Sequence, residues 1–198
     1  ISWYSPQKKL KQQMKLIKKI TFIIIFLFIN INAFGAVSGV VDNFQVTQRI
    51  ATGVVFNPDG TKMYISGMSQ NRVYEFDLTT GFDISTATRN SNECNHQPKD
   101  EDVVDLRLNS DGTKLFIVGS ENNIILEYSL TTAYDVSTCS YENTFFSGDG
   151  LDPRSMAFNT NGTKLFIYDQ TGNYSVKQYS LNSAYNLTNA TLEKQYTG

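Results

Sequence analysis

The sequence NPDGTKMYI, at residues 57 to 65, returns as NSDGTKLFI at 109 to 117 and as NTNGTKLFI at 159 to 167. Aligned on their glycines, the three copies give a repeat of about 50 residues, a period typical of propeller blades and solenoid units. This repeat, more than any single residue, decides the fold.

Each copy joins two stretches that have the composition of β-strands. A short apolar stretch precedes the turn, such as GVVFN at 53 to 57, and a β-branched and aromatic stretch follows it, such as TKMYISG at 61 to 67. A third strand comes next, such as RVYEFDL at 72 to 78. A more polar fourth strand completes each unit, and no helical periodicity is present after residue 36. Four short strands per repeat predict an all-β protein, a β-propeller of four-stranded antiparallel blades at about 50–97, 102–147 and 153–198.

The motif itself has the chemistry of a turn. Pro58 favours the first corner of a type I turn, Asp59 the second, and Gly60 the left-handed position that follows. The alternative is an Asx-rich metal loop, which needs several converging oxygens for each ion. Asn161 replaces the aspartate of the other two copies, a change that is neutral for a turn and costly for a metal site. We therefore interpret the motif as structural.

The N-terminal segment has the pattern of an export sequence. A basic stretch after Met14 leads into an apolar run at 20–29, and small residues precede a cleavage point after Gly35. The apolar run is about half of the roughly 20 residues that span a bilayer. We predict a signal peptide at 14–35, a mature chain at 36–198 and no stable membrane span after cleavage. The product would be periplasmic, extracellular or on the cell surface. Residues 1–13 precede the plausible start and are interpreted as upstream, non-native translation.

The repeat resembles a known family. NPDGTKMY at 57–64, followed by YEFDLTT at 74–80, is similar to the YVTN or lactonase-like group of bacterial β-propeller repeats. The resemblance covers residues 50–198 and implies the propeller fold. It implies little about activity, because propellers carry unrelated functions. Three blades cannot close a ring of four to eight. The chain is therefore expected to be an incomplete ring, either a truncated propeller, which we favour, or one that protomers complete together.

Composition and loop charge define the candidate binding site. A formal net charge of -2 argues against nucleic acid as a partner. The loops that enter the innermost strands include acidic stretches, at 98–105 and 148–155. They suit a divalent cation such as calcium, or a cationic or hydroxyl-rich ligand. The candidate residues are Asp100, Glu101, Asp102, Asp105, Arg107, Asp149, Asp152 and Arg154. Solvated loop charge, with Asp105 and Arg107 paired two residues apart, is the alternative that we favour.

Residues with catalytic chemistry are scarce in the sequence. His96 is the only histidine, and its polar surroundings predict a surface or loop residue rather than a general base. No nucleophile elbow or phosphate loop is present, and we assign no catalytic residue and no resident metal. The sequence therefore favours a binding or structural surface module with a protein or carbohydrate ligand. The alternative is an exported lactonase-like hydrolase whose catalytic residues lie partly in missing blades.

The two cysteines, Cys94 and Cys139, fall near the fourth strands of neighbouring repeats. Export permits a disulfide bond between them. Cys139 aligns with Ala87 of the first repeat, whereas Cys94 lies seven residues further along its strand. This offset predicts that the two do not bridge directly.

Overall fold

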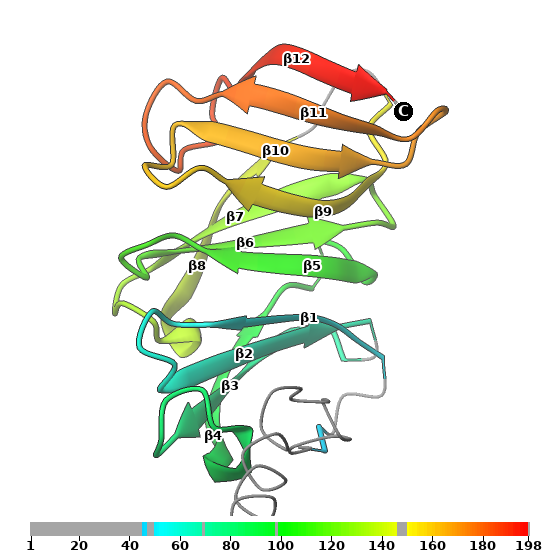
Figure 1. The fold of residues 1–198 in the computed structure, drawn as a ribbon. Helices are drawn as coiled ribbons and strands as arrows, with labels where there is room; N and C mark the ends of the chain where they lie inside the picture. The colour runs from blue at the N-terminus through cyan, green and yellow to red at the C-terminus, as the bar shows by residue number, and fades with distance from the viewer. Residues whose placement is uncertain (1–44, 47–49, 69, 98, 146–149, 198) are drawn as a thin grey trace, which may run out of the picture. The chain divides into compact units, whose positions relative to one another are not determined.

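The computed structural model of the protein describes residues 45–46, 50–68, 70–97, 99–145 and 150–197. They form three antiparallel four-stranded sheets (Figure 1). The first consists of β1 (Ala51–Phe56), β2 (Lys62–Gly67), β3 (Arg72–Leu78) and β4 (Ala87–Asn95). The second consists of β5 (Val103–Leu108), β6 (Lys114–Gly119), β7 (Ile124–Leu130) and β8 (Cys139–Phe145). The third consists of β9 (Pro153–Phe158), β10 (Lys164–Asp169), β11 (Ser175–Ser180) and β12 (Thr191–Thr197).

Each sheet has the strand order and register of a propeller blade. The strands pair in chain order, and equivalent residues pair alike: Met63 with Phe76, Leu115 with Tyr128, and Leu165 with Tyr179. The first strand of each blade neighbours that of the next, so β5 lies between β1 and β9. The prediction of an all-β, incomplete propeller is confirmed for this part of the chain.

The repeated motif forms the same turn in all three blades. In the first, the Asn57 amide oxygen accepts a hydrogen bond from the Lys62 backbone at 2.9 Å, and Asp59 accepts one from the Thr61 backbone at 3.0 Å. Gly60 has a φ of 73°, and the Phe82 ring lies where its side chain would begin. The same contacts recur around Gly112 and Gly162. The bonds from Thr61 also lower the pKa of Asp59, as those from the equivalent threonine do for Asp111.

The hydrophobic core lies mainly between the sheets, because neighbouring blades bury side chains against each other. Between blades 1 and 2 the cluster includes Tyr64, Val73, Leu106, Leu115 and Leu126. Between blades 2 and 3 it includes Phe116, Ile125, Met156, Leu165 and Tyr179. Alternate residues of one strand therefore belong to different clusters, as the two-residue period of a strand requires. Neighbouring blades depend on each other for burial.

The prediction about the cysteines is wrong, because Cys94 and Cys139 form a disulfide with a Cα–Cα distance of 5.9 Å. Aligning the repeats compares equivalent positions of the blades, but this bond joins two positions that are not equivalent, in neighbouring blades. The short 3-10 turn η2 (Val136–Thr138) packs against β4, which brings the first residue of β8 to the end of β4. Asn92 supports the same contact by donating to the Asp135 carboxylate at 3.0 Å.

The predicted upstream residues 1–13 and signal peptide 14–35 lie outside the described residues. Within the described ranges, no helix has the length and apolar character needed to cross a bilayer.

Candidate functional site

The loops that enter the first strands and the turns that follow the second strands lie together at one edge of the sheets, which we call the entry rim. It comprises residues 70–71, 99–102, 120–123, 150–152 and 170–174. Three equivalent backbone bonds join each entering segment to the end of its own second strand. Ser120 donates to the Asp102 carbonyl at 2.8 Å, Gln170 to the Asp152 carbonyl at 2.9 Å, and Met68 to the Ile50 carbonyl at 3.0 Å.

Asp100, a predicted ligand residue, is buried and holds the rim together. Its carboxylate accepts hydrogen bonds from the backbone of Asp102 and of Asn122, both at 2.9 Å. It lies directly over Gly119, where an added Cβ would come within 2.3 Å of the Asp100 carboxyl carbon. One oxygen therefore bonds within the loop before β5, and the other joins that loop to the turn after β6.

Asp169 does the same in blade 3, although sequence reasoning missed it. Its carboxylate accepts from the Asp152 backbone at 2.9 Å and the Thr171 backbone at 3.0 Å. It also forms a buried ion pair with Lys177, at 3.0 Å. Burial alone would raise the pKa of Asp169, but these hydrogen bonds outweigh it and lower the pKa. The sequence clue was the aspartate at the end of TKLFIYD, where the other repeats have glycine.

Glu101 and Asp102, also predicted, are exposed on the rim. The Glu101 backbone donates to the carboxylate of Glu121 at 3.1 Å, and Gln97 donates to the Glu101 carboxylate at 3.1 Å. Glu121 was not predicted, because it lies in the β6–β7 turn rather than in an entry loop. The structure thus brings acidic side chains of two loops together and leaves them facing solvent.

Asp105 joins two blades. One carboxylate oxygen accepts from the Leu106 backbone at 2.9 Å and from Arg107 at 2.6 Å. The other accepts from the Ser155 hydroxyl at 2.8 Å and the Met156 backbone at 3.0 Å, both in blade 3. The expected pairing of Asp105 with Arg107 is present. The contact with the next blade was not foreseen, since it spans about 50 residues of sequence.

The last predicted group lies in blade 3. Arg154 pairs with Asp152 at 2.9 Å and donates to the Gln170 side chain at 2.7 Å. Asp149 is outside the described residues, so its place in the candidate site stays a prediction. Within the described part, no group of three or more histidine, cysteine, aspartate or glutamate side chains is arranged to hold a metal ion.

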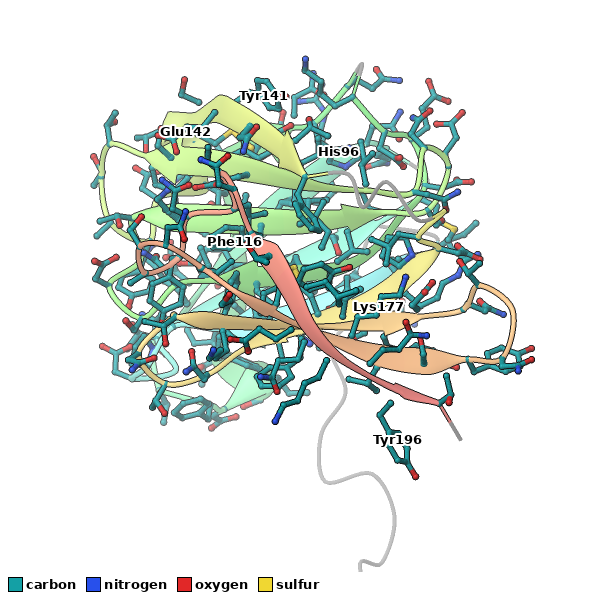
Figure 2. All side chains as sticks on the ribbon, turned by 90° about the horizontal axis from the view of Figure 1, so that it is seen from above. His96, Phe116, Tyr141, Glu142, Lys177 and Tyr196 are labelled. Atoms are coloured by element: carbon teal, nitrogen blue, oxygen red, sulfur yellow. A yellow bond between two sulfur atoms is a disulfide. The ribbon has the colours of Figure 1, made fainter. Side chains whose placement is uncertain are left out.

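His96 follows β4 in the loop, as predicted, but it is fully buried rather than on the surface. Its Nδ1 lies 2.8 Å from the Asp100 carbonyl oxygen, so Nδ1 carries the proton. Its Nε2 is buried and has no partner among the described residues. Burial outweighs the hydrogen bond to Asp100 and lowers the pKa of the imidazole. Figure 2 shows His96 among the side chains beside the sheets.

Neither a protein-family model nor a curated protein sequence matches this chain. Several solved structures do match its fold. A putative 6-phosphogluconolactonase from Bacteroides fragilis superposes with a TM-score of 0.55 at 12% identity, over 75% of this chain and 42% of its own. Its counterpart from Bacteroides uniformis gives a TM-score of 0.54 at 14% identity, over 75% of this chain and 41% of its own.

The periplasmic gluconolactonase PpgL from Pseudomonas aeruginosa gives a TM-score of 0.52 at 15% identity, covering 73% of this chain and 39% of its own. This chain therefore spans about two fifths of the length of these neighbours. Identities this low carry the fold and not the activity. The resemblance seen in the NPDGTKMY and YEFDLTT motifs is confirmed at the level of fold: the chain has a β-propeller architecture, which it shares with these neighbours.

Proposed function

We propose that this protein is an exported β-propeller module whose entry rim binds a ligand carrying cationic groups, such as a basic segment of another protein. The observation that carries the proposal is that one rim carboxylate is buried and fixes the loop, while others beside it are exposed. Asp100 is buried and bonded to two backbone amides, whereas Glu101, Asp102 and Glu121 are exposed beside it.

A fixed loop that displays charge is suited to binding. Because the loop is already held by Asp100, little conformational entropy is lost when a ligand arrives. The displayed carboxylates attract cationic groups and raise the rate of encounter. A hydroxyl-rich carbohydrate is the second ligand class, since carboxylates also accept hydrogen bonds from sugar hydroxyls.

Binding is tested with the full chain and two labelled peptides, penta-lysine and penta-glutamate, by fluorescence anisotropy. We expect binding of penta-lysine alone, weakened as salt rises from 20 to 200 mM. The double substitution Glu101→Gln with Glu121→Gln should weaken it by about fivefold or more, at roughly 0.5 kcal/mol for each exposed charge. Glu142→Gln, which removes one exposed charge on β8 away from the rim, is the control. Equal binding by the double variant and the control would refute the rim as the binding surface.

Export is tested separately, by expressing the chain from Met14 in a bacterial host and sequencing the N-terminus of the exported product. We expect Ala36 as the first residue, since small residues precede a cut after Gly35. Retention of the full chain in the cytoplasm would contradict the proposal.

A lactonase-like hydrolase is the second candidate, favoured by the fold neighbours described as gluconolactonases. Asp105 and Arg107 are then the residues to test, because they pair on β5, a first strand like those that line the centre of a propeller. Hydrolysis of glucono-δ-lactone by the full chain, lost in Arg107→Ala at an unchanged melting temperature, would support the enzyme. Asp105→Asn needs the same control, because Asp105 also joins blades 2 and 3.

A further inference from the structure

One face of each blade points toward the blade that follows it in sequence, and we call it the forward face. It is built from four equivalent positions, two on the second strand, one on the third and one on the fourth. The register of the sheets aligns them. They are Tyr64, Ser66, Val73 and Cys94 in blade 1; Phe116, Val118, Ile125 and Phe145 in blade 2; and Phe166, Tyr168, Val176 and Tyr196 in blade 3.

These positions are buried in blades 1 and 2, whereas in blade 3 Tyr168, Val176 and Tyr196 are exposed and Phe166 is half-buried. The fourth-strand position is 0% exposed at Cys94, 9% at Phe145 and 73% at Tyr196. On the third strand, Val73 and Ile125 are fully buried while Val176 is 42% exposed. Figure 2 shows Tyr196 pointing away from the sheets. An exposed apolar patch of this kind marks an interaction site.

The covered forward faces show what kind of partner such a face takes. In blade 1 the buried Glu75 accepts from the Val136 backbone of blade 2 at 3.1 Å. In blade 2, Glu127 accepts from the Leu187 backbone of blade 3, also at 3.1 Å. Both amides belong to the turn that precedes the fourth strand of the next blade. The partner therefore offers a backbone amide at a fixed place beside an apolar sheet.

Blade 3 has an amide where the other blades have a buried carboxylate, and Lys164 and Gln178 both bond to the exposed Glu193 of β12. Gln178 stands where the other blades have Glu75 and Glu127, and Ser155 stands where blade 2 has Asp105. An amide oxygen can accept the same backbone hydrogen bond without the desolvation cost of a buried carboxylate. The face thus retains an acceptor, Gln178, and apolar side chains at the equivalent positions.

We propose that the forward face of blade 3 docks a further blade of the same repeat type. The docked blade would present an apolar face like that of blade 3 itself, formed by Met156, Leu165, Ile167, Tyr179 and Leu187. Its turn amide would donate to Gln178. The inference follows from continuity with the two interfaces already formed in the chain, and from the close match of Phe166, Val176 and Tyr196 to Phe116, Ile125 and Phe145.

The test adds a blade to the full chain. A second copy of residues 148–197 is fused directly after Gly198, where the alignment of Tyr196 with Phe145 places the next blade. Because each repeat is stabilised by its neighbours, the extended chain should melt in one transition, about 5–10 °C above the original chain. Circular dichroism and calorimetry measure the shift.

Substitutions in the original blade 3 separate docking from other effects. Val176→Lys and Tyr196→Lys should each remove most of the gain, while changing the melting temperature of the unextended chain by no more than about 2 °C, because both side chains are exposed there. Tyr174→Lys, on the rim turn and 55% exposed, is the control and should keep the gain. No gain in melting temperature, or two separate transitions, would overturn the proposal. A dimer of the unextended chain that Val176→Lys disrupts, measured by light scattering, would also overturn it and would assign the face to a second copy.

Discussion

The disulfide between Cys94 and Cys139 should be a major contributor to the stability of blades 1 and 2. It joins the end of β4 to the first residue of β8 and closes a loop of 45 residues. Chain-entropy arguments give about 4 kcal/mol for a loop of this length, from the freedom that the cross-link removes from the unfolded chain. For a domain of 150 to 250 residues, each kcal/mol is about 2–4 °C, so loss of the bond should lower the melting temperature by roughly 8–16 °C.

The assay is thermal unfolding, followed by circular dichroism, of the oxidised chain, the chemically reduced chain and the double variant Cys94→Ala with Cys139→Ala. The reduced chain and the double variant should melt at similar temperatures, since both lack the cross-link. Hydrogen exchange should rise most in β4 and η2, which the bond holds together. A shift of less than about 2 °C on reduction would refute the reasoning. It would mean that the side-chain contacts between β4 and η2 fix the interface without the bond.

Three further changes probe the blade interfaces and the rim. Gly53→Ala should destabilise the chain by about 1–3 kcal/mol in urea titrations, because the new Cβ would lie 2.4 Å from the Leu106 side chain. Glu127→Ala should cost more stability than Glu127→Gln, which keeps an acceptor for the Leu187 amide; equal losses would show that this hydrogen bond contributes nothing. For His96 burial lowers the folded pKa below the ordinary imidazole value of 6.5, so the folded state binds fewer protons than the unfolded state. The contribution of neutral His96 to folding stability is therefore complete above about pH 6.5 and is lost as the pH falls below that value. His96→Gln should make the melting temperature depend less on pH between pH 5 and 7.

The fold was predictable because the turn motif, the strand composition and the repeat length all indicate the same architecture. The Asn-x-Asp-Gly-Thr-Lys motif specifies the turn, and the residues on both sides have strand composition. The turn geometry and the strand order therefore follow from local chemistry. Even the aromatic residue four positions beyond each last leucine has a local reason, since it covers the turn glycine, as Phe82 covers Gly60.

The contacts between blades were not predictable in the same way. Asp105 accepts from Met156, and Cys94 bonds Cys139, across about 45 to 51 residues of sequence. Comparing the repeats shows which position of one blade is equivalent to which position of another. It does not show which positions of neighbouring blades touch. This explains why the pairing of Asp105 with Arg107 was foreseen from a two-residue spacing, whereas its contact with blade 3 was not.

The rim illustrates the difficulty of assigning function from acidic loops. Asp100 and Asp169 come from different repeat positions, one from a loop and one from a strand, yet both accept the backbone amide of the equivalent residues Asp102 and Asp152. Gly119 leaves the space that the Asp100 carboxylate fills, and in blade 3 the strand residue itself supplies the carboxylate. Each of these two blades therefore has one buried carboxylate at this point for a structural reason. Carboxylates that hold the chain must be set aside before any are assigned to a ligand. On the rim, those that remain exposed beside Asp100 are Glu101, Asp102 and Glu121, and it is their charge, rather than that of the buried aspartates, that a ligand would meet.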